Sequence, residues 1–552
     1  MTVDVVAGSG EEGTEPDEGV ESHYVDDIPF PSRVHSHLSP TRMAYVAALN
    51  GFDPPRPRGK FVYCDLGCGN GLTVNALAAV YPDAHFYGVD FNSLHIEQAC
   101  EIRDRAGLDN VTFIQSGFEE LDPDSLPAID FMGMMGVYSW LDAKALRGVH
   151  RILAENLKPG GLFCVEFMVM PGMIAVVPVW HLLQALAPPS EGDSRERAVR
   201  ALRMLKELDR VGLGYLAQHP TAQRAVQSYV RQFETGSGGV DHFAHNALAG
   251  GFQPRYVNEV CAELGESGLR YGGRMVERLN DPELAANARQ VTILNGIEDR
   301  ITRELFLDFM RNDYNRNDLF VKDSAYDRKA ALGYLREEVG WTMRNPAAAP
   351  ARQFGLPGNR TASLDGEAYD HVRACMRSGS PTLRGIGTAT ELSDETCLTL
   401  AHRLRVGGDI LLCQPGSVGA LPEALPERIA FADAVTPCIL ERSLTYRFLA
   451  QLVSPVTGDV AMELRPREVV VIRAWHRAGL NGLVEDVMAE LASVRFNLQI
   501  NQVRKPGREF NRAEIRPFVQ AVLAGTGAAM LRLGMIVPAP DAGMQDIGNI
   551  SV

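Results

Sequence analysis

The chain has 552 residues, and because an average domain has roughly 100–200, we expect two or three domains. Its 45% hydrophobic and 22% charged residues are typical of a globular protein and exclude a mostly disordered, collagen-like or coiled-coil chain. The net charge of -15, from 54 basic and 69 acidic residues, argues against a protein that binds nucleic acid through general positive charge.

The N-terminal stretch is strongly acidic. Residues 1–27 contain nine Asp and Glu residues and no Lys or Arg, and they are rich in Gly with almost no aromatic side chains. Such a segment buries too little apolar surface to offset the loss of chain entropy on folding. We therefore predict a disordered acidic tail over residues 1–22.

The nine cysteines are scattered, without a C-x-x-C pair, in a chain large enough to fold without disulfides. This pattern, together with an N-terminus that lacks the order of a signal peptide, predicts a cytoplasmic protein. The most apolar stretch, Phe167–Ala187, contains Pro171 and Pro178. A membrane-spanning helix of about 20 residues would have to accommodate both prolines, so we predict no membrane span.

Short apolar runs alternate with helical patterns between residues 59 and 167, and this order predicts a doubly wound parallel sheet. The expected strands are Phe61–Leu66, Ala84–Asp90, Val111–Gln115, Ile129–Met134 and Leu162–Phe167. The helices expected between them are Gly71–Val80, Ser93–Ala106 and Ala143–Leu157, the last ended by the proline and glycines of Lys158–Gly161.

A glycine-rich loop, Asp65–Gly71, follows the first expected strand, with glycines at its third, fifth and seventh positions. Glycines there permit positive φ angles and a close approach of a ligand to a helix N-terminus. A dinucleotide-binding loop would need a glycine at Leu72, so an NAD-dependent enzyme is disfavoured. The second strand ends at Asp90, whose carboxylate can accept hydrogen bonds from both hydroxyls of a ribose.

This loop and the acidic strand end resemble those of class I S-adenosylmethionine-dependent methyltransferases. The resemblance implies S-adenosylmethionine as the cofactor. Asp65 would bind the methionine amino group and Asp90 the ribose hydroxyls, with Phe91 against the adenine. The other cofactor-binding residues that the resemblance implies are Gly67, Cys68, Gly69, Gly71, Gly117, Phe118, Glu119, Met135 and Gly136. Ordinary core packing is the alternative for Phe91 and Phe118.

A narrower resemblance covers residues 24 to about 325. Met135–Trp140 is similar to the GVYSW signature of bacterial methyltransferases that carry a methyltransferase regulatory domain. Pro171-Gly172, the segment around His245 and the run Gly268–Tyr271 match further motifs of that family in the same order.

The chain departs from that family at three places. Met135 stands where many relatives have histidine, Phe30 where they have tyrosine, and Glu166–Met168 replaces a Ser-Tyr-Asn-like run. These changes make the expected pocket less polar.

The resemblance implies an α/β fold with a class I methyltransferase Rossmann-like sheet of seven strands. The sixth and seventh strands would be Gly268–Met275 and Asp318–Lys322. We expect a methyltransferase domain over 23–325, with a helical insertion at about 172–250 and a regulatory-type segment at about 216–325. A helix beginning at Ser194, as its N-cap, would belong to the insertion. A linker region at 326–351 and a C-terminal mixed α/β accessory domain at 352–552 complete the expected organisation.

Methyl transfer from a sulfonium is an in-line displacement whose leaving group needs no proton, and no metal is required. The protein has to align the nucleophile and exclude water. Tyr138 is the first candidate for orienting the nucleophile, with a packed core aromatic as the alternative. His245 is the second, since it could accept a proton or touch the substrate, with a structural histidine as the alternative.

Three hypotheses for the function remain open at this point. Known members of the regulatory-domain family include lysine methyltransferases acting on bacterial outer-membrane proteins, so the resemblance favours methylation of a protein lysine nitrogen. A small-molecule N- or O-methyltransferase is the second hypothesis. A catalytically silent cofactor-binding scaffold is the third. The sequence makes no prediction of the oligomeric state.

Overall fold

The computed structural model describes residues 24–30, 33–188, 192–235, 239–494, 497–500, 502–540 and 542–546. The predicted acidic tail, residues 1–22, lies outside the described residues.

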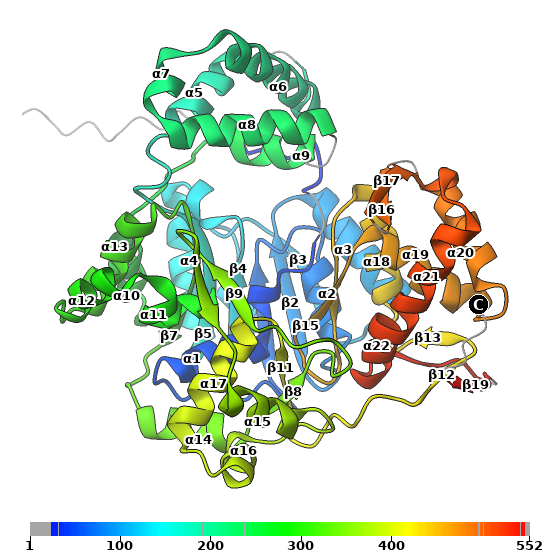
Figure 1. Ribbon diagram of the computed structural model, residues 1–552. Helices are drawn as coiled ribbons and strands as arrows, with labels where there is room; N and C mark the ends of the chain where they lie inside the picture. Colours follow the sequence, from blue (N-terminus) through cyan, green and yellow to red (C-terminus); the bar gives the residue numbers. More distant parts are fainter. Residues whose placement is uncertain are drawn as a thin grey trace, which may run out of the picture.

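A seven-stranded sheet lies at the centre of the molecule, with the strand order β3-β2-β1-β4-β5-β7-β6 (Figure 1). Strand β7 is antiparallel to its neighbours β5 and β6, and the other six strands run parallel to one another. The bounds are β1 Val62–Leu66, β2 His85–Asp90, β3 Val111–Gln115, β4 Ile129–Met134, β5 Leu157–Met168, β6 Leu269–Arg274 and β7 Asn315–Lys322. The predicted class I methyltransferase sheet is confirmed, including the two strands expected after the insertion.

Strand β5 begins five residues earlier than the sequence predicted. Leu157 already pairs with Ile129 of β4, and the pairing shifts before Leu162 pairs with Phe131. The intervening residues 158–161 therefore form an irregularity within the strand, where Gly160 takes a φ of +80°. The proline and two glycines of this run predict a helix stop, but in the structure they fit a bulge within β5.

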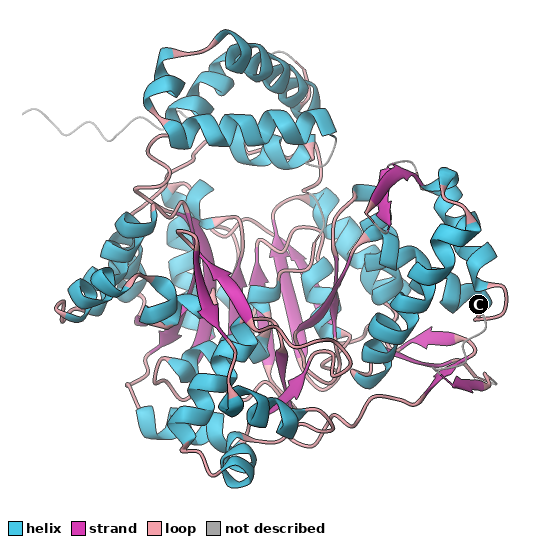
Figure 2. Ribbon diagram, in the orientation of Figure 1, coloured by secondary structure: helices cyan, strands magenta, loops and turns pink. Residues whose placement is uncertain are grey.

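Helices cover both faces of the sheet and make three layers (Figure 2). Those on one face are α1 Pro40–Leu49, α2 Leu72–Ala78 and α3 Ser93–Ala106, and those on the other are α4 Ala143–Asn156 and α10 Val257–Glu266. The regulatory-type segment adds α11 Pro282–Ala285, α12 Ala288–Asn295 and α13 Arg300–Arg311. Apolar side chains from each helical layer and the sheet form a separate buried cluster on each face.

The chain between β5 and α10 forms a helical cap beyond one edge of the sheet (Figure 1). Its elements are α5 Val177–Leu186, α6 Ser194–Val211, α7 Gly214–Gln218, α8 Pro220–Thr235, α9 Val240–Phe243 and a π-helical turn, Ala244–Leu248. The predicted N-cap of α6 is off by one residue. Asp193 accepts a hydrogen bond from the Glu196 amide at 2.7 Å, whereas the Ser194 amide donates to Asp27.

The region expected as a linker, 326–351, contains two ordered elements. Helix α14, Arg328–Glu337, packs on α1, and strand β8, Gly340–Met343, pairs with β11, Ile410–Cys413. Trp341 in β8 is fully buried. The Pro- and Ala-rich run that suggested a linker only follows this strand.

The C-terminal region is a mixed α/β structure built from two-stranded antiparallel pairs and helices. Its strands are β9 Gln353–Leu356, β10 Arg360–Ser363, β12 Ala424–Pro426, β13 Ile429–Phe431, β14 Ala450–Val453, β15 Val460–Leu464, β16 Asn497–Ile500, β17 Val503–Pro506, β18 Ile536–Pro538 and β19 Met544–Asp546. Its helices are α15 Glu367–Met376, α16 Leu383–Thr390, α17 Asp394–Val406, α18 Thr436–Tyr446, α19 Pro466–Ala478, α20 Leu483–Ser493, α21 Arg512–Val522 and α22 Ala528–Arg532.

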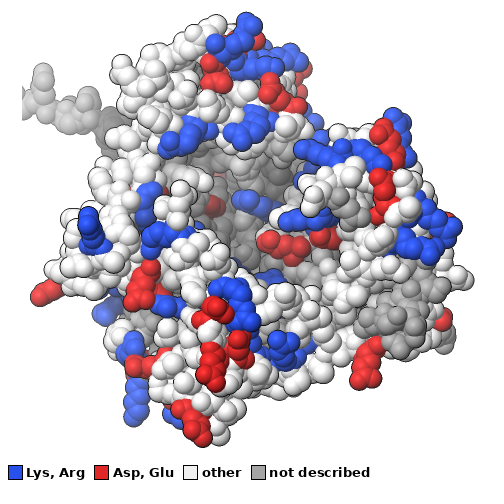
Figure 3. Space-filling view, viewed as in Figure 1, with Lys and Arg blue, Asp and Glu red and all other residues white. Residues whose placement is uncertain are grey.

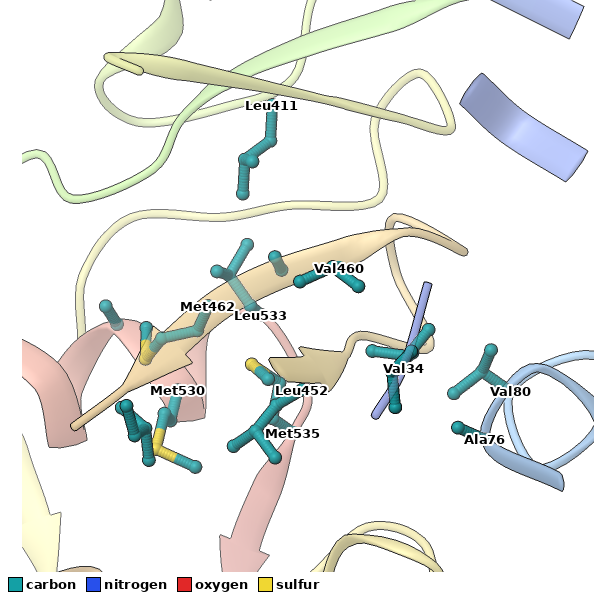
Figure 4. Packing of buried hydrophobic residues seen from close by; sticks show 14 of the residues in the cluster. Val34, Ala76, Val80, Leu411, Leu452, Val460, Met462, Met530, Leu533 and Met535 are labelled. Carbon is teal, nitrogen blue, oxygen red and sulfur yellow. The ribbon is translucent and has the colours of Figure 1, made fainter. Parts of the chain in front are cut away.

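One hydrophobic core joins this region to the sheet. Val34, Ala76 and Val80 from the N-terminal half lie close to Leu452 and Val460 from the β14–β15 pair (Figure 4). The C-terminal region therefore packs directly against the helical layer that carries α2.

In the part of the chain that the structure describes, no helix is both long and apolar enough to cross a membrane.

Candidate functional site

A cavity opens where β1 and β2 end, beneath the helical cap. Three parts of the chain enclose it: the loop after β1, the segment that leads into α1, and the π-helical turn of the cap. Its empty space is about 980 Å³, part of it open to solvent. In the face that Figure 3 shows, basic and acidic side chains both surround a hollow below the cap, so this face does not carry a single sign of charge.

The loop after β1 supplies the floor of the cavity. Gly67, Gly69 and Gly71 have φ angles of +77°, +54° and +66°, which favour glycine. A Cβ at Gly67 would lie 2.5 Å from Val137, and one at Gly71 would lie 2.5 Å from the side chain of Ala99. The loop therefore needs glycine for both its backbone conformation and its packing, and it leads directly into the N-terminus of α2.

Asp65 lies at the end of β1 and is 3% exposed. Its Oδ1 has no hydrogen-bond partner among the described residues. Burial raises the pKa of Asp65 to about 7, and the nearby charge of Asp90 contributes. A buried carboxylate with an unpaired oxygen is suited to receive a cationic group such as an ammonium.

Asp90, at the end of β2, is held in place from three sides. Its Oδ2 accepts a hydrogen bond from the Gly69 amide at 2.8 Å, and its Oδ1 accepts one from the Asn92 amide at 3.0 Å. His95 Nδ1 lies 3.2 Å from the same Oδ1, while His95 Nε2 accepts a hydrogen bond from the Phe30 amide at 3.0 Å. The Nε2 acceptor role places the proton of neutral His95 on Nδ1, where it faces Asp90.

The leading segment, which we define as residues 24–30 and 33–38, covers the cavity. Phe30 packs edge-on against His245 with 5.2 Å between ring centroids, and His245 Nε2 lies 3.0 Å from the Ile28 carbonyl oxygen. The proton on Nε2 therefore donates to this carbonyl. Burial lowers the pKa of His245 to about 4, so the imidazole is neutral at physiological pH. These contacts support a structural role for His245 in holding the segment over the cavity.

Tyr138 is not among the residues that line the cavity. Its side chain is fully buried in the cluster between the sheet and α10, and its hydroxyl donates to Glu263 at 2.9 Å. Burial raises the pKa of Tyr138, and Glu263 adds to the rise. This placement matches the core aromatic that was the alternative for Tyr138, and it gives no support to a catalytic role.

The remaining predicted cofactor residues divide into two groups. Cys68, Phe91, Met135 and Gly136 line the cavity as expected. Phe91 is 48% exposed, so the core-packing alternative does not describe it. Gly71, Gly117, Phe118 and Glu119 are not among the lining residues. Phe118 lies in the core beside α4, where its carbonyl approaches Gly148. The structure therefore gives the Gly117–Glu119 run no contact with the cavity.

Several residues that line the cavity were not predicted as site residues from the sequence: Arg33, Asn70, Thr73, His95, Trp140 and Asn246. Asn70 is part of the loop motif, so its neighbours could have indicated it. His95 gave no such signal, because its two partners lie five residues before it and 65 residues before it in the chain. Thr73 shows the same long-range dependence, since its hydroxyl accepts a hydrogen bond from the His35 amide at 3.0 Å.

The donor and acceptor set fits S-adenosylmethionine. The unpaired oxygen of Asp65 suits its amino group. Asp90 lies at the adjacent strand end, where its carboxylate would accept hydrogen bonds from the ribose hydroxyls. Arg33 is exposed at the cavity and offers a cation for the methionine carboxylate. Within the described residues, no group of three or more His, Cys, Asp or Glu side chains is placed to hold a metal ion.

Two family models match the chain. Residues 58–199 match a methyltransferase domain, and residues 241–322 match a predicted methyltransferase regulatory domain. The first range contains the glycine loop, Asp90 and the strands β1 to β5. The second contains His245 and the strands β6 and β7.

Two relatives and one solved structure are similar to this chain. A protein of Synechocystis sp. described as uncharacterised is 26% identical over 442 residues, which cover 79% of this chain and 84% of the relative. A sterol 24-C-methyltransferase of Gibberella zeae is 30% identical over 102 residues, 18% of this chain and 26% of the relative. The structure of PKMT2 from Rickettsia typhi in complex with AdoHcy superposes with a TM-score of 0.65 at 15% identity, covering 92% of this chain and 99% of that one. At this identity the likeness shows a shared fold.

Proposed function

We propose that this chain, an S-adenosylmethionine-dependent methyltransferase with a methyltransferase regulatory domain, transfers the methyl group to the side-chain nitrogen of a protein lysine. The observation that carries the proposal is the extent of the shared architecture. The fold in common with PKMT2 includes the cap, the regulatory segment and the C-terminal region, and not only the central sheet. The proposal is also supported by the resemblance of residues 24 to about 325 to a family whose members include protein-lysine methyltransferases.

The chain's own contribution to the transfer is positioning. Bound S-adenosylmethionine supplies an electrophilic methyl group on a positively charged sulfur, so the leaving group needs no proton. Asp65 would hold the amino group of the cofactor and Asp90 its ribose, and the leading segment with His245 would exclude water from the cavity. The acceptor nitrogen has to arrive neutral, because an ammonium has no lone pair.

Labelling of proteins tests the proposal directly. The full-length protein is incubated with S-adenosylmethionine tritiated in its methyl group and with lysate, and the acid-precipitated protein is hydrolysed to amino acids. We expect the label to be recovered as N-methylated lysine. Label confined to the acid-soluble fraction, or recovered on another amino acid, would rule out a protein-lysine acceptor.

A small-molecule N- or O-methyltransferase is the second candidate function, and the cover over the cavity favours it. Tyr24, Phe30 and Trp140 line the cavity together with His245, so the cofactor site is enclosed by the leading segment and the cap. An enclosed site admits a small acceptor easily. In the labelling experiment this candidate places the label in the acid-soluble fraction.

A further inference from the structure

A second cavity lies at the same edge of the sheet as the first one. It is formed where β6 ends and β7 begins, and its empty space is about 810 Å³, part of it open to solvent. Its polar lining residues include Arg278, Asp313, Asn315 and Asn317, together with three arginines that are paired with carboxylates, Arg274, Arg311 and Arg316. We call it the β7 cavity, and the first one the cofactor cavity.

Glu166, near the end of β5, lies between a residue that lines the first cavity and a residue that lines the second. Its Oε2 would lie 3.8 Å from a Cβ at Gly136, which lines the cofactor cavity. Its Oε1 accepts a hydrogen bond from Asn315 Nδ2, and Asn315 lines the β7 cavity. Glu166 therefore contacts the linings of both cavities, although it is not itself among the lining residues of either.

The contacts of Glu166 come from the neighbouring strand β7. Glu166 of β5 pairs directly with Asn317 of β7, so their side chains point to the same face of the sheet, together with Asn315 two residues away. Asn317 Nδ2 donates to Asn315 Oδ1 at 2.9 Å. This chain of hydrogen bonds fixes the orientation of the Glu166 carboxylate.

The β7 cavity also contains polar atoms that lack partners among the described residues. Asn317 is 9% exposed, and its Oδ1 accepts no hydrogen bond from them. The Nε of Arg278 is buried and equally unpaired. An acceptor and a donor of this kind match the N–H and C=O of a peptide backbone, because buried polar groups are costly without partners.

We infer that the β7 cavity receives the methyl acceptor and that Glu166 binds its amine. The inference rests on the proposed function, and it names the residues that select an amine-bearing peptide. The nitrogen lone pair forms the new N–C bond, the electron pair of the broken C–S bond stays on sulfur, and the methylated ammonium then releases one proton to water. Positive charge thus moves from sulfur to nitrogen. A carboxylate beside the nitrogen stabilises the transition state more than the ground state.

Glu166→Gln tests this role, because the substitution removes the charge and keeps the size of the side chain. The probe is N-acetyl-lysine-N-methylamide, titrated into the full-length protein loaded with S-adenosylhomocysteine. We expect binding of the probe to weaken about tenfold or more, as for the loss of a charged hydrogen bond, with binding of S-adenosylhomocysteine unchanged. Glu101→Gln on the exposed face of α3 is the matched control and should alter neither affinity.

The pH profile separates a catalytic carboxylate from a merely structural one. In single turnovers with the same probe, Glu166→Gln should slow the transfer about 100-fold at high pH. The rising limb of the profile should also move to lower pH, because without the carboxylate the bound amine loses its proton more easily. A structural defect would lower the rate without moving the limb.

Arg278→Met tests the peptide contact separately. It should weaken binding of N-acetyl-lysine-N-methylamide but not of n-propylamine, which has no peptide groups. The inference is overturned if the wild-type protein binds neither probe, or if Glu166→Gln binds the lysine probe as tightly as the wild type does.

The outcomes also separate this inference from the proposed function. If lysate proteins are labelled on lysine and Glu166→Gln binds the probe like the wild type, the amine site at Glu166 is rejected and the proposed function stands. If the probe binds only when Glu166 is present but no lysate protein is labelled, the amine site stands and a protein acceptor is rejected.

Discussion

Individual side chains at the cofactor cavity differ in how well the sequence predicts them. Asp65, Asp90, Gly67 and Gly69 line the cavity and are fixed by spacing within one loop and one strand end, so a short stretch of sequence contains the whole signal. Tyr138 follows β4 at the expected edge, but the direction of its side chain is set by Glu263, 125 residues later. His95 was missed for the same reason, since its role depends on contacts made across the fold.

The raised pKa of Asp65 leads to a prediction about how cofactor binding depends on pH. Its pKa in the folded protein, about 7, lies above the ordinary value of 3.8, so the free protein holds a proton on Asp65 below pH 7. Protonated Asp65 therefore stabilises the folded protein. This contribution to the free energy of unfolding is fully present below about pH 4 and is lost as the pH rises through 7. An ammonium bound beside the carboxylate favours its ionised form. We therefore expect cofactor binding at pH 6 to release up to about one proton, and affinity to fall as the pH drops below 7.

Calorimetry in two buffers with different ionisation enthalpies counts that proton. Asp65→Asn provides the control, because an amide cannot release a proton. If wild type and Asp65→Asn release equal numbers of protons at pH 6, Asp65 is not the group that meets the ammonium.

Elements were predicted best where strands and helices follow one another closely. The alternation before residue 167 gave β1 to β4 nearly to the residue, because each strand is a short apolar run between turn residues. The leading segment was predicted only as a general cover. Its path depends on the contacts of Phe30 with His95 and of Ile28 with His245, and no local pattern contains these contacts.

The backbone conformation of the glycine loop leads to a prediction about cofactor binding. Gly67→Ala should weaken cofactor binding, because a residue with a Cβ at a φ of +77° costs about 1–2 kcal/mol and the new methyl would meet Val137. Binding of S-adenosylhomocysteine, measured together with the melting temperature, checks it. Gly69→Ala is the matched control, since φ is also positive there but no atom lies within 4 Å of the new Cβ. Equal losses in the two variants would mean that contact with Val137 does not matter.

The whole molecule was the hardest level to predict. The C-terminal region contains no motif, and the segment 326–351 looked like a linker because its proline- and alanine-rich run is the strongest local signal. Burial of Trp341 and pairing of β8 with β11 are long-range features. The boundaries of the predicted domains stay predictions, since the hydrophobic core continues from the sheet into the C-terminal region.

A buried ion network joins the two halves. Arg405 of α17 donates to both carboxylate oxygens of Glu277 at 2.7 Å and to Asp459 at 3.3 Å, and Arg42 of α1 lies 3.2 Å from Asp459. All but Arg42 have side chains less than 10% exposed. Removal of one partner leaves buried charges without compensation.

We therefore expect Arg405→Ala to lower the free energy of unfolding by about 3–5 kcal/mol in urea titrations. Arg384→Ala is the control. It removes an exposed arginine that pairs with Glu337, so it should change the free energy of unfolding by less than about 1 kcal/mol. A variant Arg405→Ala as stable as the wild type would show that the network does not hold the halves together.

The central claim is that the cavity at the ends of β1 and β2 holds the cofactor, and binding of S-adenosylhomocysteine to Asp90→Ala tests it most directly. Asp130→Ala is the matched control, since Asp130 lies on β4 at the opposite edge of the sheet and pairs with Lys158. We predict 1:1 binding to wild type and Asp130→Ala, and a loss of about 1.5–3 kcal/mol in Asp90→Ala with folding intact. No binding to the wild type, or equal affinity in all three proteins, would contradict the account.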